Sequence, residues 1–254
     1  HTLFNLVNAI IFLPLIGVLA KISTMAIRGR DKEVEVHLKY LDNRVLNTPP
    51  IALAQARSET RRMARVALEM VDETLAFLKD NDLKRLPALE KKEVLTDALQ
   101  KEITNFLVSL SQKSITQESS QEVASMMHMV NDLERVGDYC ENLWLLSQRK
   151  LDQKITFSAI AMNEIAEISE VTRSFLARIV KALEEKDLEV YAEAQRLEDA
   201  IDDLEERLRN NHIRRLNTGE CTVNSGLIFI DMLHNLEKIG DHTFNLAKAV
   251  VGRK

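Results

Sequence analysis

Four pairs of acidic residues are the part of this 254-residue chain that could do chemistry. Each pair has the spacing Glu-x-x-x-Asp, which places both carboxylates on one side of a helix, because residues four apart are neighbours there. The eight residues are Glu93, Asp97, Glu134, Asp138, Glu198, Asp202, Glu237 and Asp241. Like charges at this spacing repel by roughly 0.2–0.5 kcal/mol in an isolated helix. A basic neighbour or a bound cation must therefore offset the repulsion.

Two of the pairs lie in segments that repeat each other. Residues 131–142 read NDLERVGDYCEN, and residues 235–245 read NLEKIGDHTFN. When Glu134 is aligned with Glu237, the flanking leucine, basic residue, branched residue, glycine, aspartate and asparagine all match. Such a repeat indicates two copies of one structural unit. The other two pairs, in EVLTD and EDAID, add one further acidic pair to each copy.

A glycine stands directly before the aspartate in both repeats, at Gly137 and Gly240. Glycine within a helix costs roughly 1 kcal/mol relative to alanine. We therefore expect another helix or a ligand close to the backbone at both positions. His234, one turn before Glu237, is a candidate nitrogen ligand. An ordinary solvated histidine at a helix edge is the alternative.

Six helical segments must position these residues. Apolar residues recur in them every three or four positions, and glycine and proline are scarce. We expect helices at about residues 51–81, 88–112, 117–150, 158–185, 188–216 and 223–251. The run Asn47-Thr48-Pro49-Pro50 favours a helix start, and Asn217-Thr218-Gly219 favours a helix end. Short loops between six helices predict an all-α fold of two repeated antiparallel three-helix bundles.

Residues 3–22 are the most apolar stretch and are about long enough to span a bilayer. We expect one transmembrane helix there, with a buried helix of a soluble protein as the alternative. The basic residues that follow place the rest of the chain in the cytoplasm, at the inner membrane. The chain begins at His1, within a hydrophobic pattern, which suggests a longer protein.

The predicted domain organisation has four parts. They are a transmembrane helix of a transporter domain (residues 1–24), a linker (residues 25–49), and two repeats (residues 50–150 and 151–254). A brief alternation of apolar residues at residues 34–38 allows a short strand in the linker.

Composition excludes several classes of function. The net charge of −5 does not favour nucleic acid as a partner. The two cysteines, Cys140 and Cys221, do not suggest a disulfide framework. The chain has no glycine-rich phosphate loop, no nucleophile–base motif and no Glu-x-x-His motif of a di-iron carboxylate enzyme. We therefore expect no catalytic residues and no enzymatic activity.

The repeated (N/H)xLE(R/K)(V/I)GD segments, in a three-plus-three helical frame, resemble the PhoU family of phosphate-response proteins from about Pro50 to Gly252. The initial HTLFNLVNAIIFLPL looks like the last membrane helix of the bacterial sodium–phosphate cotransporter family, whose members carry a PhoU-like domain after their membrane part. The PhoU resemblance implies multinuclear metal sites of iron or zinc, held by the eight acidic residues. Oxygen-only ligands favour magnesium, calcium, manganese or iron over tetrahedral zinc.

Together the resemblances imply the C-terminal part of a sodium-dependent transporter of inorganic phosphate. Its cytoplasmic PhoU-like module would bind metal and regulate transport, with the membrane and the rest of the transporter domain as partners and phosphate and sodium as transported species. A homodimer is left open. The alternatives are a PhoU-type phosphate-signalling adaptor and a metal-free helical scaffold, whose carboxylates pair with residues such as Arg61, Arg62 or Arg135.

Overall fold

The computed structural model describes residues 38–252. The expected membrane helix, most of the linker and most of the candidate strand at residues 34–38 lie outside that range. Within residues 38–252 no helix is long and apolar enough to cross a membrane, and the same residues contain no strand.

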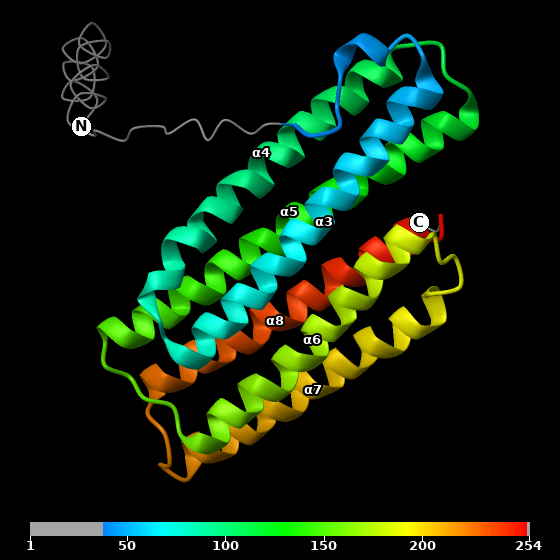
Figure 1. Ribbon diagram of the computed structural model, residues 1–254. Coiled ribbons are helices and arrows are strands. Elements are labelled where there is room, and N and C mark those ends of the chain that lie inside the picture. Colours follow the sequence, from blue (N-terminus) through cyan, green and yellow to red (C-terminus); the bar gives the residue numbers. More distant parts are fainter. Residues whose placement is uncertain (1–37, 253–254) are drawn as a thin grey trace, which may run out of the picture. The chain divides into compact units, whose positions relative to one another are not determined.

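Six long helices form the described part of the chain, as predicted (Figure 1). They are α3 (Pro49–Asp80), α4 (Leu86–Ser111), α5 (Gln117–Asp152), α6 (Ala159–Glu185), α7 (Tyr191–Asn217) and α8 (Val223–Val250). Each begins and ends within three residues of its predicted bounds. Two short 3₁₀ turns, η1 (Asn43–Val45) and η2 (Leu83–Arg85), precede α3 and α4 and had no clear sequence signal.

Local residue chemistry explains where the helices begin and end. The hydroxyls of Thr116, Ser158 and Thr222 each accept a hydrogen bond from a first-turn amide of α5, α6 and α8, which satisfies one of the free N–H groups there. Asn81 ends α3 in the left-handed conformation, with φ 54°. Gly219 has φ 73° just after α7, which confirms the predicted stop signal.

The helices pack as two bundles of three. Helices α3, α4 and α5 contact one another, as do α6, α7 and α8, and the bundles meet where α5 lies against α8 and α3 against α6 (Figure 1). One apolar core runs through both bundles. It includes Met126 and Trp144, which are 1% and 2% exposed.

A polar contact lies inside the interface between the bundles. Asp132 of α5 is 2.8 Å from Nδ1 of His242 on α8, and it accepts a hydrogen bond of 3.3 Å from the amide of Asn245. Tyr139 stacks on the His242 ring at a centroid distance of 5.6 Å. Because Asp132 is nearly buried, this contact fixes the register of α5 against α8.

The two repeated glycines differ in the space beside them. A Cβ at Gly240 would lie 3.1 and 3.3 Å from side-chain carbons of Ile201 on α7. A Cβ at Gly137 would lie at an ordinary 3.5 Å from Thr96 on α4 and 3.7 Å from Met70 on α3. Close approach of another helix is therefore confirmed at Gly240. At Gly137 the neighbours leave room for a methyl group.

We expect Gly137→Ala and Gly240→Ala to have different effects on stability. Both gain about 1 kcal/mol of helix propensity, but Gly240→Ala must also displace the buried Ile201, and overpacking costs about 1–3 kcal/mol. Urea unfolding of each variant should show Gly137→Ala at or above the parent chain and Gly240→Ala below Gly137→Ala. Equal stability of the two variants would contradict this account.

Candidate metal centre

The first acidic cluster joins α4 and α5. Asp97, Glu134 and Asp138 each place one carboxylate oxygen within 4.8 Å of the others. The geometry follows from the sequence spacing, because Glu134 and Asp138 are one turn apart on α5. Packing of α4 against α5 then adds Asp97.

Crowding of negative charge perturbs this cluster. The pKa of Glu93 is raised to about 7, because burial disfavours its charged form and because Asp97 and Glu141 are negative neighbours. The pKa of Glu134 is also raised, by burial and by Asp138. Burial is the larger cause of both shifts, and repulsion between the carboxylates adds to it.

The second cluster has the equivalent position in the second bundle. Glu198 and Asp202 of α7 and Asp241 of α8 place carboxylate oxygens within 4.8 Å of one another. Burial raises the pKa of Glu198, with Asp202 as the next cause. The pKa of Asp202 is raised by burial and then by Asp241. The two clusters therefore join the same pair of helices in each bundle, but α4 gives one carboxylate and α5 two, whereas α7 gives two and α8 one.

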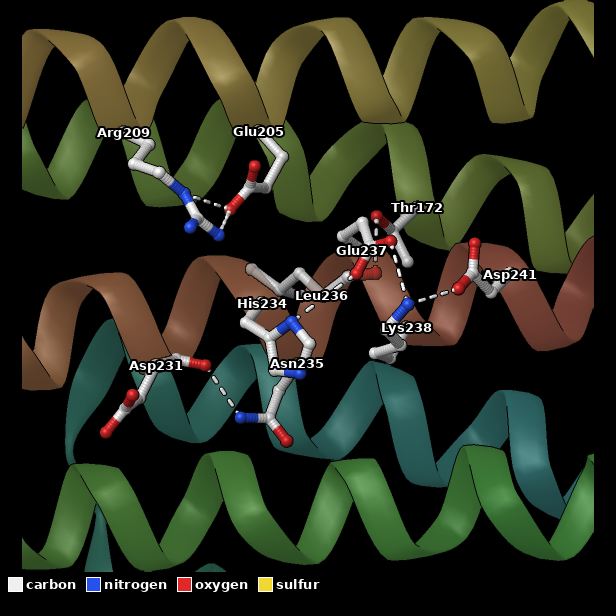
Figure 2. A network of polar contacts seen from close by, with 10 residues as sticks. All are labelled: Thr172, Glu205, Arg209, Asp231, His234, Asn235, Leu236, Glu237, Lys238 and Asp241. Atoms are coloured by element: carbon white, nitrogen blue, oxygen red, sulfur yellow. Dashed lines mark hydrogen bonds and ion pairs between the residues drawn. The ribbon is translucent and has the colours of Figure 1, made fainter.

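Two of the eight predicted residues lie outside the three-carboxylate groups. Glu93 is absent from the first group, although its pKa responds to Asp97 and Asp138. Glu237 is absent from the second group. Figure 2 shows Lys238 between Glu237 and Asp241: its Nζ donates hydrogen bonds to Glu237 at 3.1 Å and to Asp241 at 2.5 Å.

His234 also lies beside Glu237 rather than within the second group (Figure 2). Its Nδ1 is 3.6 Å from a Glu237 carboxylate oxygen, and its side chain is 52% exposed. The arrangement matches the alternative of an ordinary solvated histidine.

Basic residues offset part of the charge in both repeats. In the first, Arg135 lies 3.0 Å from Asp138 and 3.7 Å from Glu134. Arg62 pairs with Glu59 instead, and Arg61 donates to the backbone carbonyl of Leu183. The expected pairing is thus confirmed for Arg135 and wrong for Arg61 and Arg62.

Glu141 is a neighbour of the first cluster that the sequence analysis missed. Burial raises the pKa of Glu141, and Asp138 and Asp97 raise it further. It follows Asp138 by three positions and Glu134 by seven on α5. Residues at these spacings share a helix face, so an extension of the acidic row would have found it.

The donor set fits a hard cation. Each group offers three carboxylates from two helices, all with oxygen donors, which suit magnesium, calcium, manganese or iron. The residues that would hold it are Asp97, Glu134 and Asp138 in the first group and Glu198, Asp202 and Asp241 in the second. A bound cation would offset the repulsion between the carboxylates of each group.

The raised pKa of Glu93 predicts a pH dependence of stability in the presence of a chelator. A carboxyl whose pKa is near 7 in the folded state and near 4.5 in the unfolded state binds its proton more tightly when folded. The stability that Glu93 contributes is fully present below its pKa in the unfolded chain. That stability is lost as the pH rises through its pKa in the folded chain.

We therefore expect the chelated chain to unfold at lower urea concentration at about pH 8 than at about pH 5, and Glu93→Gln to reduce that difference. Glu90→Gln, an exposed glutamate on the same helix, is the control. An equal pH dependence in both variants would contradict the assignment to Glu93.

Comparison with known proteins decides the family. The PhoU domain matches residues 60–144 and 165–250, which is more than half of the chain. The chain belongs to the PhoU domain family. Both matched ranges hold one complete acidic cluster, so the resemblance drawn from the repeated segments is confirmed at the level of the family.

Relatives and solved structures agree with that assignment. The chain is 25% identical over 201 residues to the phosphate-specific transport system accessory protein PhoU homolog of Clostridium acetobutylicum, covering 78% of this chain and 90% of the relative. The crystal structure of PhoU from Pseudomonas aeruginosa superposes with a TM-score of 0.73 at 18% identity, covering 79% of this chain and 95% of that one. The PhoU-like fold is thereby established.

A second kind of relative is longer than this chain. The putative inorganic phosphate export protein YjbB of Escherichia coli is 22% identical over 254 residues, which cover 99% of this chain and 47% of YjbB. The chain thus spans about half the length of that relative. The resemblance of the N-terminal segment to a sodium–phosphate cotransporter helix stays a prediction, as does metal binding.

Proposed function

We propose that residues 38–252 form a PhoU-type adaptor module that regulates phosphate movement across a membrane, from its cytoplasmic side. The observation that carries the proposal is the match of two PhoU domains, one to each bundle. Two named relatives, a phosphate transport accessory protein and a putative phosphate exporter, support it. Neither name describes an enzyme, in agreement with the expected lack of catalysis.

The attachment to a transporter is the finer part of the proposal. Residues 1–24 would be the last membrane helix of a phosphate transporter, coupled to sodium, with the adaptor following a short linker. The alignment to YjbB supports this order, because it covers the N-terminal segment as well as the helices.

Phosphate flux in vesicles that contain the full-length transporter would test both parts. Removal of residues 38–254 should change the flux or its response to phosphate, and replacement of sodium by choline should abolish flux. Unchanged flux and response after the truncation would overturn the regulatory role. Flux without sodium would overturn the coupling alone.

We also propose that the two acidic clusters bind metal and that the metal couples α4 to α5 and α7 to α8. The support is the repeated group of three carboxylates with raised pKa values. Metal identity among magnesium, calcium, manganese, iron and zinc is left to elemental analysis of the purified chain.

Asp138→Asn combined with Asp241→Asn removes one carboxylate from each cluster. We expect stoichiometric metal in the parent chain and its loss in this double variant. Glu90→Gln combined with Glu206→Gln removes the same charge from exposed positions outside both groups and should retain the metal. Equal metal content in both double variants would overturn the site.

The salt bridges to Arg135 and Lys238 favour a second candidate, a metal-free scaffold. In that case chelation leaves the melting temperature unchanged, and both double variants melt close to the parent chain. The metal measurement and the melting measurement together separate the two candidates.

A further inference from the structure

A pocket at one end of the second bundle lies away from the acidic clusters. Its volume is about 160 Å³, and four hydroxyl side chains line it, those of Thr156, Ser158, Thr222 and Ser225. Figure 1 shows why they meet: α6 and α8 begin, and α7 ends, at the same end of the bundle. His212, also in the pocket wall, follows Asp202 by ten positions on α7, about 15 Å along the helix axis.

Two helix N-termini point their capping residues at this pocket. Ser158 caps α6 and Thr222 caps α8, and each hydroxyl oxygen accepts a hydrogen bond from a backbone N–H, of 3.2 and 3.3 Å. An accepting hydroxyl still has its own proton to donate. Both side chains are exposed and neither proton has an acceptor among residues 38–252, so each can donate to water or to a ligand. The N-terminal end of a helix also carries partial positive charge. Both features favour an anion.

His212 provides an independent sign of a ligand. The residue is only 2% exposed, and its Nε2 is fully buried without a hydrogen-bond partner in the described part of the chain. That atom faces α8, because a Cβ at Gly226 would lie 2.5 Å from it. Its ring stacks on Phe229 at a centroid distance of 4.9 Å. Nδ1 is the other ring nitrogen, and it has no hydrogen-bond partner among residues 38–252. A ligand in the adjoining pocket, which His212 lines, would bond to the ring through Nδ1.

Charged residues lie in and near the wall of the pocket. Arg215 lines it and makes a two-point ion pair with Glu164, at 3.0 and 2.5 Å. Lys150, only 6% exposed, lies over the ring of Phe157, another pocket residue, and has no carboxylate partner among residues 38–252. Glu220 also lines the pocket, but it is exposed and accepts a hydrogen bond from Thr218.

We propose that this pocket binds a small tetrahedral oxyanion with the chemistry of inorganic phosphate, held by the capping hydroxyls of Ser158 and Thr222, the first-turn amides of α6 and α8, and His212. The volume fits such an ion with a little water, and it is below the roughly 300–1,000 Å³ of pockets for drug-sized ligands. The proposal does not depend on metal in the acidic clusters.

Ser225→Glu tests the site without weakening the helix. Ser225 is the third residue of α8 and follows the capping Thr222 by three positions. A glutamate there completes a Thr-x-x-Glu capping box but places a carboxylate in the pocket. Ser119→Glu is the matched control, since Ser119 follows the capping Thr116 of α5 by three positions and is not part of the pocket. Ser158→Asp is a second test, because aspartate is also a good helix cap.

The measurement is calorimetric titration of the full 254-residue chain in detergent with inorganic phosphate, at constant ionic strength and with EDTA present. We expect saturable binding by the parent chain and by Ser119→Glu, and at least about tenfold weaker binding by Ser225→Glu and Ser158→Asp, because like charges repel at close range. Circular dichroism checks that each variant is folded.

No saturable binding by the parent chain would overturn the proposal, as would equal affinities of Ser225→Glu and Ser119→Glu. A parallel titration with glycerol 3-phosphate separates a free ion from the phosphate group of a larger molecule. Binding of either one that Ser225→Glu weakens supports the oxyanion site. EDTA keeps this result separate from metal binding by the acidic clusters, so either proposal can fail alone.

Discussion

Glu164→Ala is expected to lower the free energy of unfolding by about 3–5 kcal/mol, since removal of one partner strands the other charge of a buried ion pair. Glu164 of α6 pairs with Arg215 of α7, and their side chains are only 10% and 12% exposed. Glu164 also accepts a hydrogen bond of 3.1 Å from Asn211. Without Glu164, Arg215 would lose its carboxylate partner in a site where water cannot replace it fully.

The matched control joins the same two helices. Glu167 of α6 pairs with Arg207 of α7, but these side chains are 49% and 55% exposed. Exposed pairs contribute about 0–1 kcal/mol, so Glu167→Ala should cost less than about 1 kcal/mol. Urea unfolding followed by circular dichroism compares the two. If both variants lose a similar, small free energy of unfolding, burial of the Glu164–Arg215 pair does not contribute to stability.

A double variant separates two possible causes of the lost stability: an unpaired charge on Arg215 and the loss of side-chain packing. Glu164→Leu with Arg215→Met replaces both charges by apolar side chains of comparable length. Such replacements of buried pairs are often neutral or stabilising. We therefore expect this double variant to recover most of the stability that Glu164→Ala loses.

Glu59→Ala is expected to release the segment before α3 from the first bundle. Glu59 has no exposed surface, and one of its carboxylate oxygens accepts hydrogen bonds from the backbone amides of Lys39 and Tyr40, at 3.0 and 2.7 Å. The other oxygen lies 2.6 Å from Arg62. A fully buried donor left without a partner costs roughly 1–3 kcal/mol, and these two amides are only partly buried.

The two amides can regain water if the segment leaves α3, so we expect local opening more than global unfolding. Hydrogen exchange of peptides from residues 38–46 should become at least about tenfold faster in Glu59→Ala, because about 1.4 kcal/mol corresponds to a factor of ten. Ser58→Ala, at a half-buried position of the same helix where the hydroxyl donates to the carbonyl of Ala54, is the control. Unchanged exchange in Glu59→Ala would show that this carboxylate does not hold the segment.

The segment of residues 38–46 joins the helices to residues 1–37. The Glu59→Ala variant can therefore also be measured in the phosphate flux assay.

Sequence periodicity determined the helices. The spacing of apolar residues, the capping hydroxyls and the stop at Gly219 are local signals, and local hydrogen bonds set most helix ends. The acidic pairs on single helices were equally predictable, because four positions along a helix always form one turn. The repeat around Gly137 and Gly240 then indicated two similar bundles and the correct family.

Tertiary packing decided everything that joins residues from different helices. Which carboxylates of neighbouring helices meet, as Asp97 does with Asp138, depends on the register of the two helices.

The proposed oxyanion pocket is likewise a product of tertiary packing and could not be predicted from the sequence. Ser158 is 54 positions from His212 and 64 from Thr222, and His212 is ten positions from Thr222. No shared sequence motif links the three residues. They line one pocket because α6 and α8 begin where α7 ends. Spacing along one helix determines which side chains share a face, whereas contacts between helices depend on how the core packs, and no short sequence pattern encodes that packing.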